Sequence, residues 1–180
     1  MNRVYFEEVQ YFREHRWLVA LILALGLAAL IPIAYGLYWQ VLKGQPWGDE
    51  PLSNTGLTLL FLFVMFSFGM AMFMFLTMKL ELRIDEDGIH YRFFPIKNKW
   101  HLIPKNQIAE YRVEKKLRLF QTGGFGHHRN LFTKTRSYRF IGTSHLFLVL
   151  HTGEKIFLGT EKPGEAEWAL KKMLTVNPTS

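Results

Sequence analysis

The chain contains no cysteine among its 180 residues. This absence excludes disulfide bonds, a thiolate nucleophile and any zinc or iron–sulfur site built on cysteine. It does not indicate a redox compartment, because a chain without cysteine suits either side of a membrane. Any chemistry must therefore come from other residue types.

Charge is absent from two long stretches in the N-terminal half. Neither Trp17–Leu42 nor Pro51–Met78 contains Asp, Glu, Lys, Arg or His. A helix needs about 20 apolar residues to cross a bilayer, and its backbone satisfies its own hydrogen bonds there. A signal peptide has a shorter apolar region, and the rest of the chain is too small to bury two such helices. Both stretches are therefore predicted to be transmembrane helices.

The connector Lys43–Thr55 is short and rich in glycine and proline, which indicates a turn. We therefore predict an antiparallel hairpin over residues 17–79. The residues that flank its spans are more basic than the connector: Arg13 and Arg16 precede it and Lys79 and Arg83 follow it. The positive-inside rule then predicts that both termini face the cytoplasm.

Residues 1–16 form an amphipathic N-terminal segment. Val4, Tyr5, Phe6, Val9 and Phe12 follow helical spacing, with charged residues between them. Two interpretations remain open for this segment. It is an amphipathic helix on the membrane or against the soluble domain, or it is an N-terminal extension of the first transmembrane helix.

The charge balance changes in residues 79–180, which hold 18 of the 22 Lys+Arg and 10 of the 15 Asp+Glu. Such an excess favours an anionic partner, although a solubilising surface explains it too. Alternating apolar and polar residues predict about seven short strands, with hairpin turns at Asp87-Gly88 and Thr152-Gly153. The strands are expected at residues 80–85, 88–94, 98–103, 107–116, 134–141, 145–151 and 154–158, and a closing helix at 163–176.

Seven antiparallel strands and one C-terminal helix predict a β-rich barrel or roll of the pleckstrin-homology (PH) type over residues 80–180. A plain sandwich with a packed helix is the alternative. The expected fold class is thus a membrane α-helical hairpin followed by a PH-like barrel or roll with a C-terminal helix.

Several sequence features also resemble a known family. They are the two spans, LRIDEDGIHYRFFP, Trp100 with Ile103-Pro104, GGFG at 123–126 and KIFLGTEKP at 155–163. Together they resemble small bacterial two-span membrane proteins of Bacteroidetes type with a bacterial PH-like domain. The resemblance implies the bacterial inner membrane and a cytoplasmic PH-like domain, and it brings no catalytic motif. The HHRNLFTKTRSYR stretch is more basic than the resemblance predicts.

The strongest functional feature of the sequence is a basic cluster around loop 117–133, interleaved with aromatic residues. The anionic cytoplasmic leaflet attracts such residues by about 1 kcal/mol each. Lipid docking, protein docking and an idle solvated face remain open. The candidate lipid- or partner-binding residues are Lys115, Lys116, Arg118, Arg129, Lys134, Arg136, Arg139, Phe125 and Phe132, with Gly123, Gly124 and Gly126 giving the loop flexibility.

Features of other functional classes are weak in this sequence. The seven histidines are scattered, so no metal site is predicted, and no cofactor motif is present. Asp85, Glu86 and Asp87 fall at a hairpin turn, where turn chemistry explains them. We predict a non-enzymatic binding or scaffolding module whose partners are the lipid bilayer and either another membrane protein or a second copy, without nucleic acid. The alternative is an accessory subunit of a larger membrane enzyme or transporter.

Overall fold

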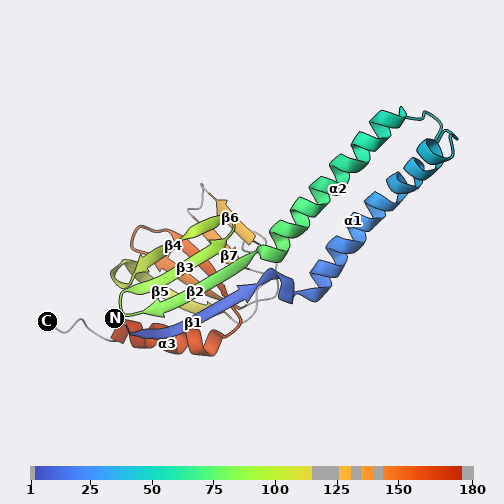
Figure 1. Cartoon of the computed structure of the whole chain (residues 1–180). Coiled ribbons are helices and arrows are strands. Elements are labelled where there is room, and N and C mark those ends of the chain that lie inside the picture. The colour runs from blue at the N-terminus through green and yellow to red at the C-terminus, as the bar shows by residue number, and fades with distance from the viewer. Residues whose placement is uncertain (1–2, 115–125, 131–134, 140–143, 176–180) are drawn as a thin grey trace. The chain divides into compact units, whose positions relative to one another are not determined.

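The computed structural model of the chain contains two compact units (Figure 1). The helical unit comprises residues 13–77, and the β unit comprises residues 1–12 together with 78–180. The structure describes residues 3–114, 126–130, 135–139 and 144–175, and of 126–130 and Arg139 it describes the backbone. The chain leaves the β unit after its first strand and returns to it after the second long helix.

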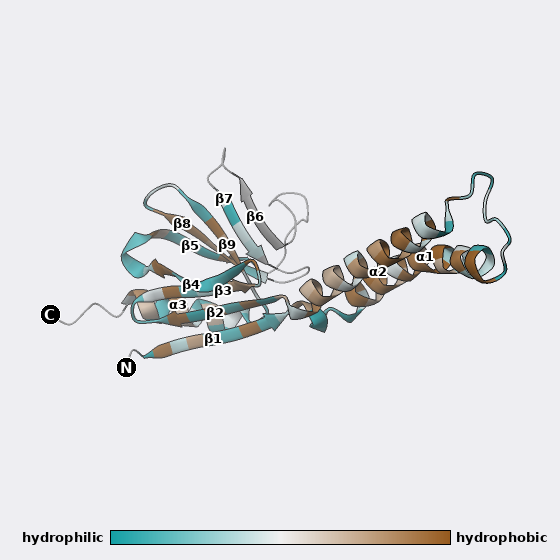
Figure 2. Cartoon of the chain, turned by 45° about the horizontal axis from the view of Figure 1, so that its top comes forward, coloured by the Kyte–Doolittle hydropathy of each residue, from teal (hydrophilic) through white to brown (hydrophobic). Residues whose placement is uncertain are grey.

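The helical unit consists of two long apolar helices that pack side by side. Helix α1 ends in a π-helical segment, η2, and α2 returns after the connector. Apolar residues extend along both helices (Figure 2). At Gly26 the helices approach closely, because a Cβ there would lie 2.0 Å from the Phe68 ring. The bounds are α1 Arg16–Leu37, η2 Tyr38–Leu42 and α2 Asn54–Thr77.

The connector of the helical unit is ordered by one buried polar side chain, Gln40. Its Nε2 donates to the carbonyl oxygen of Leu52 and, at 3.0 Å, to Asn54 Oδ1 at the start of α2. Trp47 lies over Gly36, where an added Cβ would meet its ring at 2.5 Å. The connector therefore folds back on the ends of the two helices.

The first sheet of the β unit has the strand order β1-β2-β3-β4, with every neighbouring pair antiparallel. Gly88 opens β3 at a φ of 155°, and a Cβ there would lie 2.1 Å from the Ile103 carbonyl oxygen. Only glycine suits this close approach. The strands are β1 Val4–Tyr11, β2 Lys79–Asp85, β3 Gly88–Phe94 and β4 Lys97–Pro104, with the short helix η1 Phe12–Glu14 after β1.

The predicted helix in the N-terminal segment is wrong, because residues 4–11 form strand β1. Phe6, Glu8 and Gln10 alternate on the buried face of this strand. Because two of these three buried residues are polar, the sequence does not show the alternation of apolar and polar residues that is typical of a strand. They are buried because they bond to β9: Gln10 Nε2 donates to Gly159 O at 2.9 Å, and Glu8 accepts from Thr160 Oγ1 at 2.6 Å. A partner distant in sequence therefore decides the conformation of β1.

The second sheet has the order β5-β8-β9-β7-β6 and is mixed, because β7 runs parallel to β9. The prediction of antiparallel strands alone is therefore wrong for this pair. Among the described residues the strands form two sheets, and a closed barrel is not seen. All seven predicted strands are present, β3 with the predicted bounds and the others with shifted ends, whereas β1 and β6 were not predicted. The bounds are β5 Ile108–Glu114, β6 Gly126–Asn130, β7 Thr135–Arg139, β8 Ser144–Leu150 and β9 Lys155–Thr160, with η3 Lys105–Gln107 before β5.

Helix α3 (Pro163–Thr175) confirms the predicted C-terminal helix. It packs on β1 and β2 of the first sheet and on β5 and β8 of the second. Its buried face carries Ala166, Ala169, Leu170 and Met173, all fully inaccessible. The core between sheets and helix is apolar and includes Leu80, Leu82, Ile84, Ile89, Phe93, Leu146, Leu148 and Leu158.

Candidate functional site

Most of the basic cluster predicted from sequence lies outside the described residues: Lys115, Lys116, Arg118, Gly123, Gly124, Phe125, Phe132 and Lys134. The backbones of Gly126, Arg129 and Arg139 lie in the β6–β7 ladder, where Gly126 pairs with Arg139 and Arg129 with Arg136. The described part of the cluster is thus a two-stranded ribbon at the edge of the second sheet.

Arg136 is the one candidate whose side chain is described. It is half-buried, and its Nε forms an ion pair with Glu154, the residue before β9. Arg136 also lies close enough to His101 for its charge to act on that imidazole. The basic ribbon therefore adjoins residues of the first sheet that the sequence did not associate with it.

Four side chains meet where the first sheet faces β7, in what we call the β4–β7 seam: Lys97 and His101 of β4, Tyr91 of β3 and Tyr138 of β7. The Lys97 ammonium donates to the hydroxyl of buried Tyr138 at 2.5 Å and lies 4.9 Å from the centre of its ring. The Tyr91 ring lies 4.9 Å from that of Tyr138 and 5.4 Å from the His101 imidazole. The seam is therefore an aromatic stack beneath a group of cationic side chains.

Burial in this seam favours the uncharged forms of His101 and Tyr91. Burial, followed by the positive charges of Lys97 and Arg136, lowers the pKa of His101. Burial and the neighbouring Tyr138 raise the pKa of Tyr91 to about 12, against a smaller opposite effect of the two cations. The seam thus has a positive potential that would favour a nearby anionic group.

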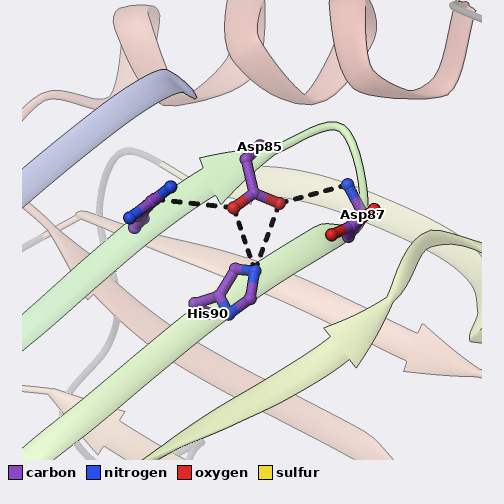
Figure 3. A network of polar contacts seen from close by, with 4 residues as sticks. Asp85, Asp87 and His90 are labelled. Carbon is purple, nitrogen blue, oxygen red and sulfur yellow. Dashed lines mark hydrogen bonds and ion pairs between the residues drawn. The ribbon is translucent and has the colours of Figure 1, made fainter. Parts of the chain in front are cut away.

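A second polar cluster surrounds Asp85 at the β2–β3 turn (Figure 3). The nearly buried carboxylate accepts from the backbone N–H of Asp87 at 3.1 Å and lies 3.0 Å from His90 Nε2. Arg83 Nε lies 3.5 Å from the same carboxylate, as an ion pair without hydrogen-bond geometry. The hydrogen bond from Asp87 supports the interpretation of these residues as turn residues. The contact between Asp85 and His90 was not predicted from the sequence.

A pocket of about 420 Å³ adjoins this cluster, lined by Arg83, Asp85, Asp87, His90 and Trp100. An imidazole held by a carboxylate is suited to proton exchange or to binding a polar group. Among the described residues, those that line this pocket include no hydroxyl nucleophile. Across the described part of the chain, no group of three His, Asp or Glu residues could hold a metal ion.

An ionic ladder crosses the outer face of the first sheet beside this pocket. Glu81 contacts Arg92 on β3, and its Oε1 lies 2.7 Å from Lys79 Nζ. Burial acts to raise the pKa of Glu81, but hydrogen bonds from Arg92 and Lys79 lower it overall. Arg92 also lies 5.0 Å above the ring of half-exposed Trp100. The outer face is therefore a charged surface with an aromatic edge.

Comparison of the chain with models of known protein families, with curated proteins and with solved structures found no match. The functional argument therefore depends on the geometry of the two units alone.

Proposed function

We propose that the chain is a membrane-anchored, non-enzymatic binding module: a two-span hairpin that holds a PH-like domain at the cytoplasmic face of a bacterial inner membrane. The PH-like domain would dock a protein or the anionic membrane surface. Two sheets covered by a C-terminal helix support the PH-like assignment, since that fold is built from the same elements. No hydrolytic or metal chemistry is needed to explain the clusters described above.

The long helices support the membrane part of this proposal. Both are long and apolar enough to span a bilayer, and few of the residues in their most apolar stretches are buried within the chain. Large apolar side chains such as Phe63, Phe66 and Phe73 are about two-thirds exposed. A core helix of a soluble protein would be mostly buried, so these surfaces need lipid or another protein around them.

A single observation carries the topology: the two attachment points of the helical unit are neighbours in one sheet. Tyr11 pairs with Lys79, and the Phe12 N–H donates to Met78 O at 3.0 Å. A chain that leaves and returns at adjacent positions must have both ends on one side of the membrane. Together with the basic flanks, this pairing supports a cytoplasmic β unit.

The absence of cysteine makes this topology directly testable. Single cysteines are introduced in the connector (Asp49→Cys) and in the β8–β9 turn (Thr152→Cys), both at exposed positions. We expect a membrane-impermeant maleimide to label Asp49→Cys in intact cells, and Thr152→Cys only after the cells are opened. Labelling of Thr152→Cys in intact cells, or extraction of the chain by alkaline carbonate, would contradict the proposal.

The accessory-subunit alternative draws support from the exposed apolar helix surfaces, which another membrane protein could cover as well as lipid. Purification in mild detergent distinguishes the two. Stoichiometric recovery of a catalytic or transport subunit with the chain favours the accessory role. Recovery of the chain alone, or of a complex of its own copies, favours an independent module.

A further inference from the structure

The β3–β4 turn lies at the same end of the first sheet as the two attachment points of the helical unit. In the strand register, Tyr11 pairs with Lys79, and Lys79 pairs with Phe94. The turn, Pro95-Ile96, follows directly. The β2–β3 turn, with Asp85, lies at the opposite end.

The turns at the two ends of this sheet differ in the charged residues that they carry. Between Phe94 and Trp100 the sequence has Lys97 and Lys99 and no acidic residue. The opposite turn carries Asp85, Glu86 and Asp87 in succession. A turn with an exposed lysine and no acidic residue, at the end of the sheet that is attached to the helices, suits an anionic surface.

Chain geometry limits how far the turn lies from a membrane that holds α2. Thr77 is the last residue of α2, and Lys79 follows two residues later. Two residues span at most about 7 Å, and a neighbouring strand adds about 5 Å. Phe94 therefore lies within about 12 Å of the end of α2, and the headgroup layer is itself about 5–8 Å deep.

The exposed residues of the turn have the chemistry of a membrane interface. Ile96 is 49% exposed, whereas Phe93, which lies three residues earlier on β3, is fully buried. Lys99, three residues after Ile96, is also exposed. An aliphatic side chain at a loop tip and a nearby lysine suit the boundary between headgroups and acyl chains.

We propose that the β3–β4 turn docks on the anionic headgroup layer of the membrane in which the chain is anchored. Ile96 enters the apolar boundary and Lys99 lies among the lipid phosphates. This inference rests on the proposed function, because it requires α2 to span the bilayer.

A second copy of the chain is a less suitable occupant for this turn. Two such turns brought together would oppose Lys99 to its counterpart without an acidic residue of the turn between them, and like charges in an interface are unfavourable. An anionic lipid surface offers the opposite charge and an apolar layer beneath it. Charge complementarity therefore selects lipid.

The test uses full-length protein carrying one environment-sensitive fluorophore at Asn98→Cys, an exposed position beside the turn. Vesicles contain phosphatidylcholine, with or without phosphatidylglycerol, and nitroxide quenchers on the headgroups or the acyl chains. We expect headgroup quenching at residue 98 to be several-fold stronger in anionic than in neutral vesicles. A label at Thr152→Cys serves as the distant reference, since the β8–β9 turn contacts the β4–β5 connection through His151 N and Gln107 O.

Matched variants distinguish docking of the turn on the membrane from mere proximity to it. Ile96→Asp should reduce the quenching at residue 98 several-fold, and Lys99→Glu should remove its dependence on anionic lipid. Val4→Asp makes the same apolar-to-acidic change at an equally exposed position, 42% exposed, at the far end of the sheet. It should leave the quenching unchanged.

The outcomes also distinguish this inference from the proposed function. A third label, at Phe66→Cys in α2, reports acyl-chain contact. If that label is quenched by acyl-chain nitroxides while residue 98 is insensitive to lipid charge and to Ile96→Asp, the docking is refuted and the anchoring stands. If the Phe66 label is not quenched, both fail. Shielding of residue 98 that rises with protein density indicates a second copy and also refutes lipid docking.

Discussion

The backbone N–H of Phe12 donates a 3.0 Å hydrogen bond to the carbonyl oxygen of Met78, although the whole helical unit separates these residues in sequence. This bond continues the β1–β2 ladder up to the point where the chain enters and leaves the helices. Strand β1 is therefore the element that fixes both ends of the hairpin to one domain, and its stability should govern that of the β unit.

Glu8 should be a stability determinant of the β unit. Its buried carboxylate accepts from Thr160 Oγ1 at 2.6 Å and from Glu161 N at 2.7 Å. Removal of a charged partner from buried donors costs about 2 kcal/mol. We expect Glu8→Ala to lower the free energy of unfolding in urea, measured in mild detergent, by that amount. The substitution Glu7→Ala at the neighbouring exposed position should change this free energy by less than about 0.5 kcal/mol. Equal losses of stability in the two variants would show that the buried hydrogen bonds of Glu8 do not stabilise the β unit.

Gly26 and Gly69 offer a matched pair in the helical unit. A Cβ at Gly26 would lie 2.0 Å from the Phe68 ring, whereas nothing lies within 4 Å of a Cβ at Gly69. Both changes to alanine gain the same helix propensity, but Gly26→Ala also displaces Phe68, at a cost of about 1–3 kcal/mol. We expect Gly26→Ala to melt below Gly69→Ala in detergent. Identical melting temperatures would show that the helices do not pack at Gly26.

Acid should weaken the β unit partly through Glu81. Hydrogen bonds and charges from Arg92 and Lys79 outweigh the larger single effect of burial and hold its pKa below the ordinary 4.5. A lowered carboxyl pKa gives stability that is present above pH 4.5 and is lost as the pH falls through the folded-state pKa. Glu81→Gln should be less stable than wild type at neutral pH, and the difference should shrink below pH 4.5. Parallel curves of unfolding free energy against pH would contradict this.

Alkali should act through Tyr91. Burial and Tyr138 raise its pKa from 10.0 to about 12 in the folded state. The unfolded chain therefore loses this proton first, so the contribution of Tyr91 is present below pH 10 and is lost as the pH rises towards 12. Tyr91→Phe should make the fall in unfolding free energy between pH 10 and 12 less steep. The slope below pH 9 serves as the internal control and should be unaltered.

The seven predicted strands and the C-terminal helix show how much of the fold local pattern determines. Alternation in β2, β3 and β8 and the glycine turns at residues 88 and 153 were sufficient to predict these elements, because each buries one face against a common core. The two apolar helices were equally predictable from the sequence. The candidate site was harder to predict. Arg136 was identified, but Lys97 and His101 were not, because only the packing of β4 near β7 brings these two residues close to Arg136.

The sequence by itself determined the two apolar helices, most of the strands and the basic excess of the second half, since each depends on residues close together in the chain. Only the tertiary structure decided that residues 4–11 form a strand and that the strands make two sheets. It also decided that the β3–β4 turn shares a sheet end with the helix attachments. The physical reason is that β-pairing joins segments distant in sequence. Glu8 and Gln10 are buried in a strand only because Thr160 and Gly159 provide their hydrogen-bond partners.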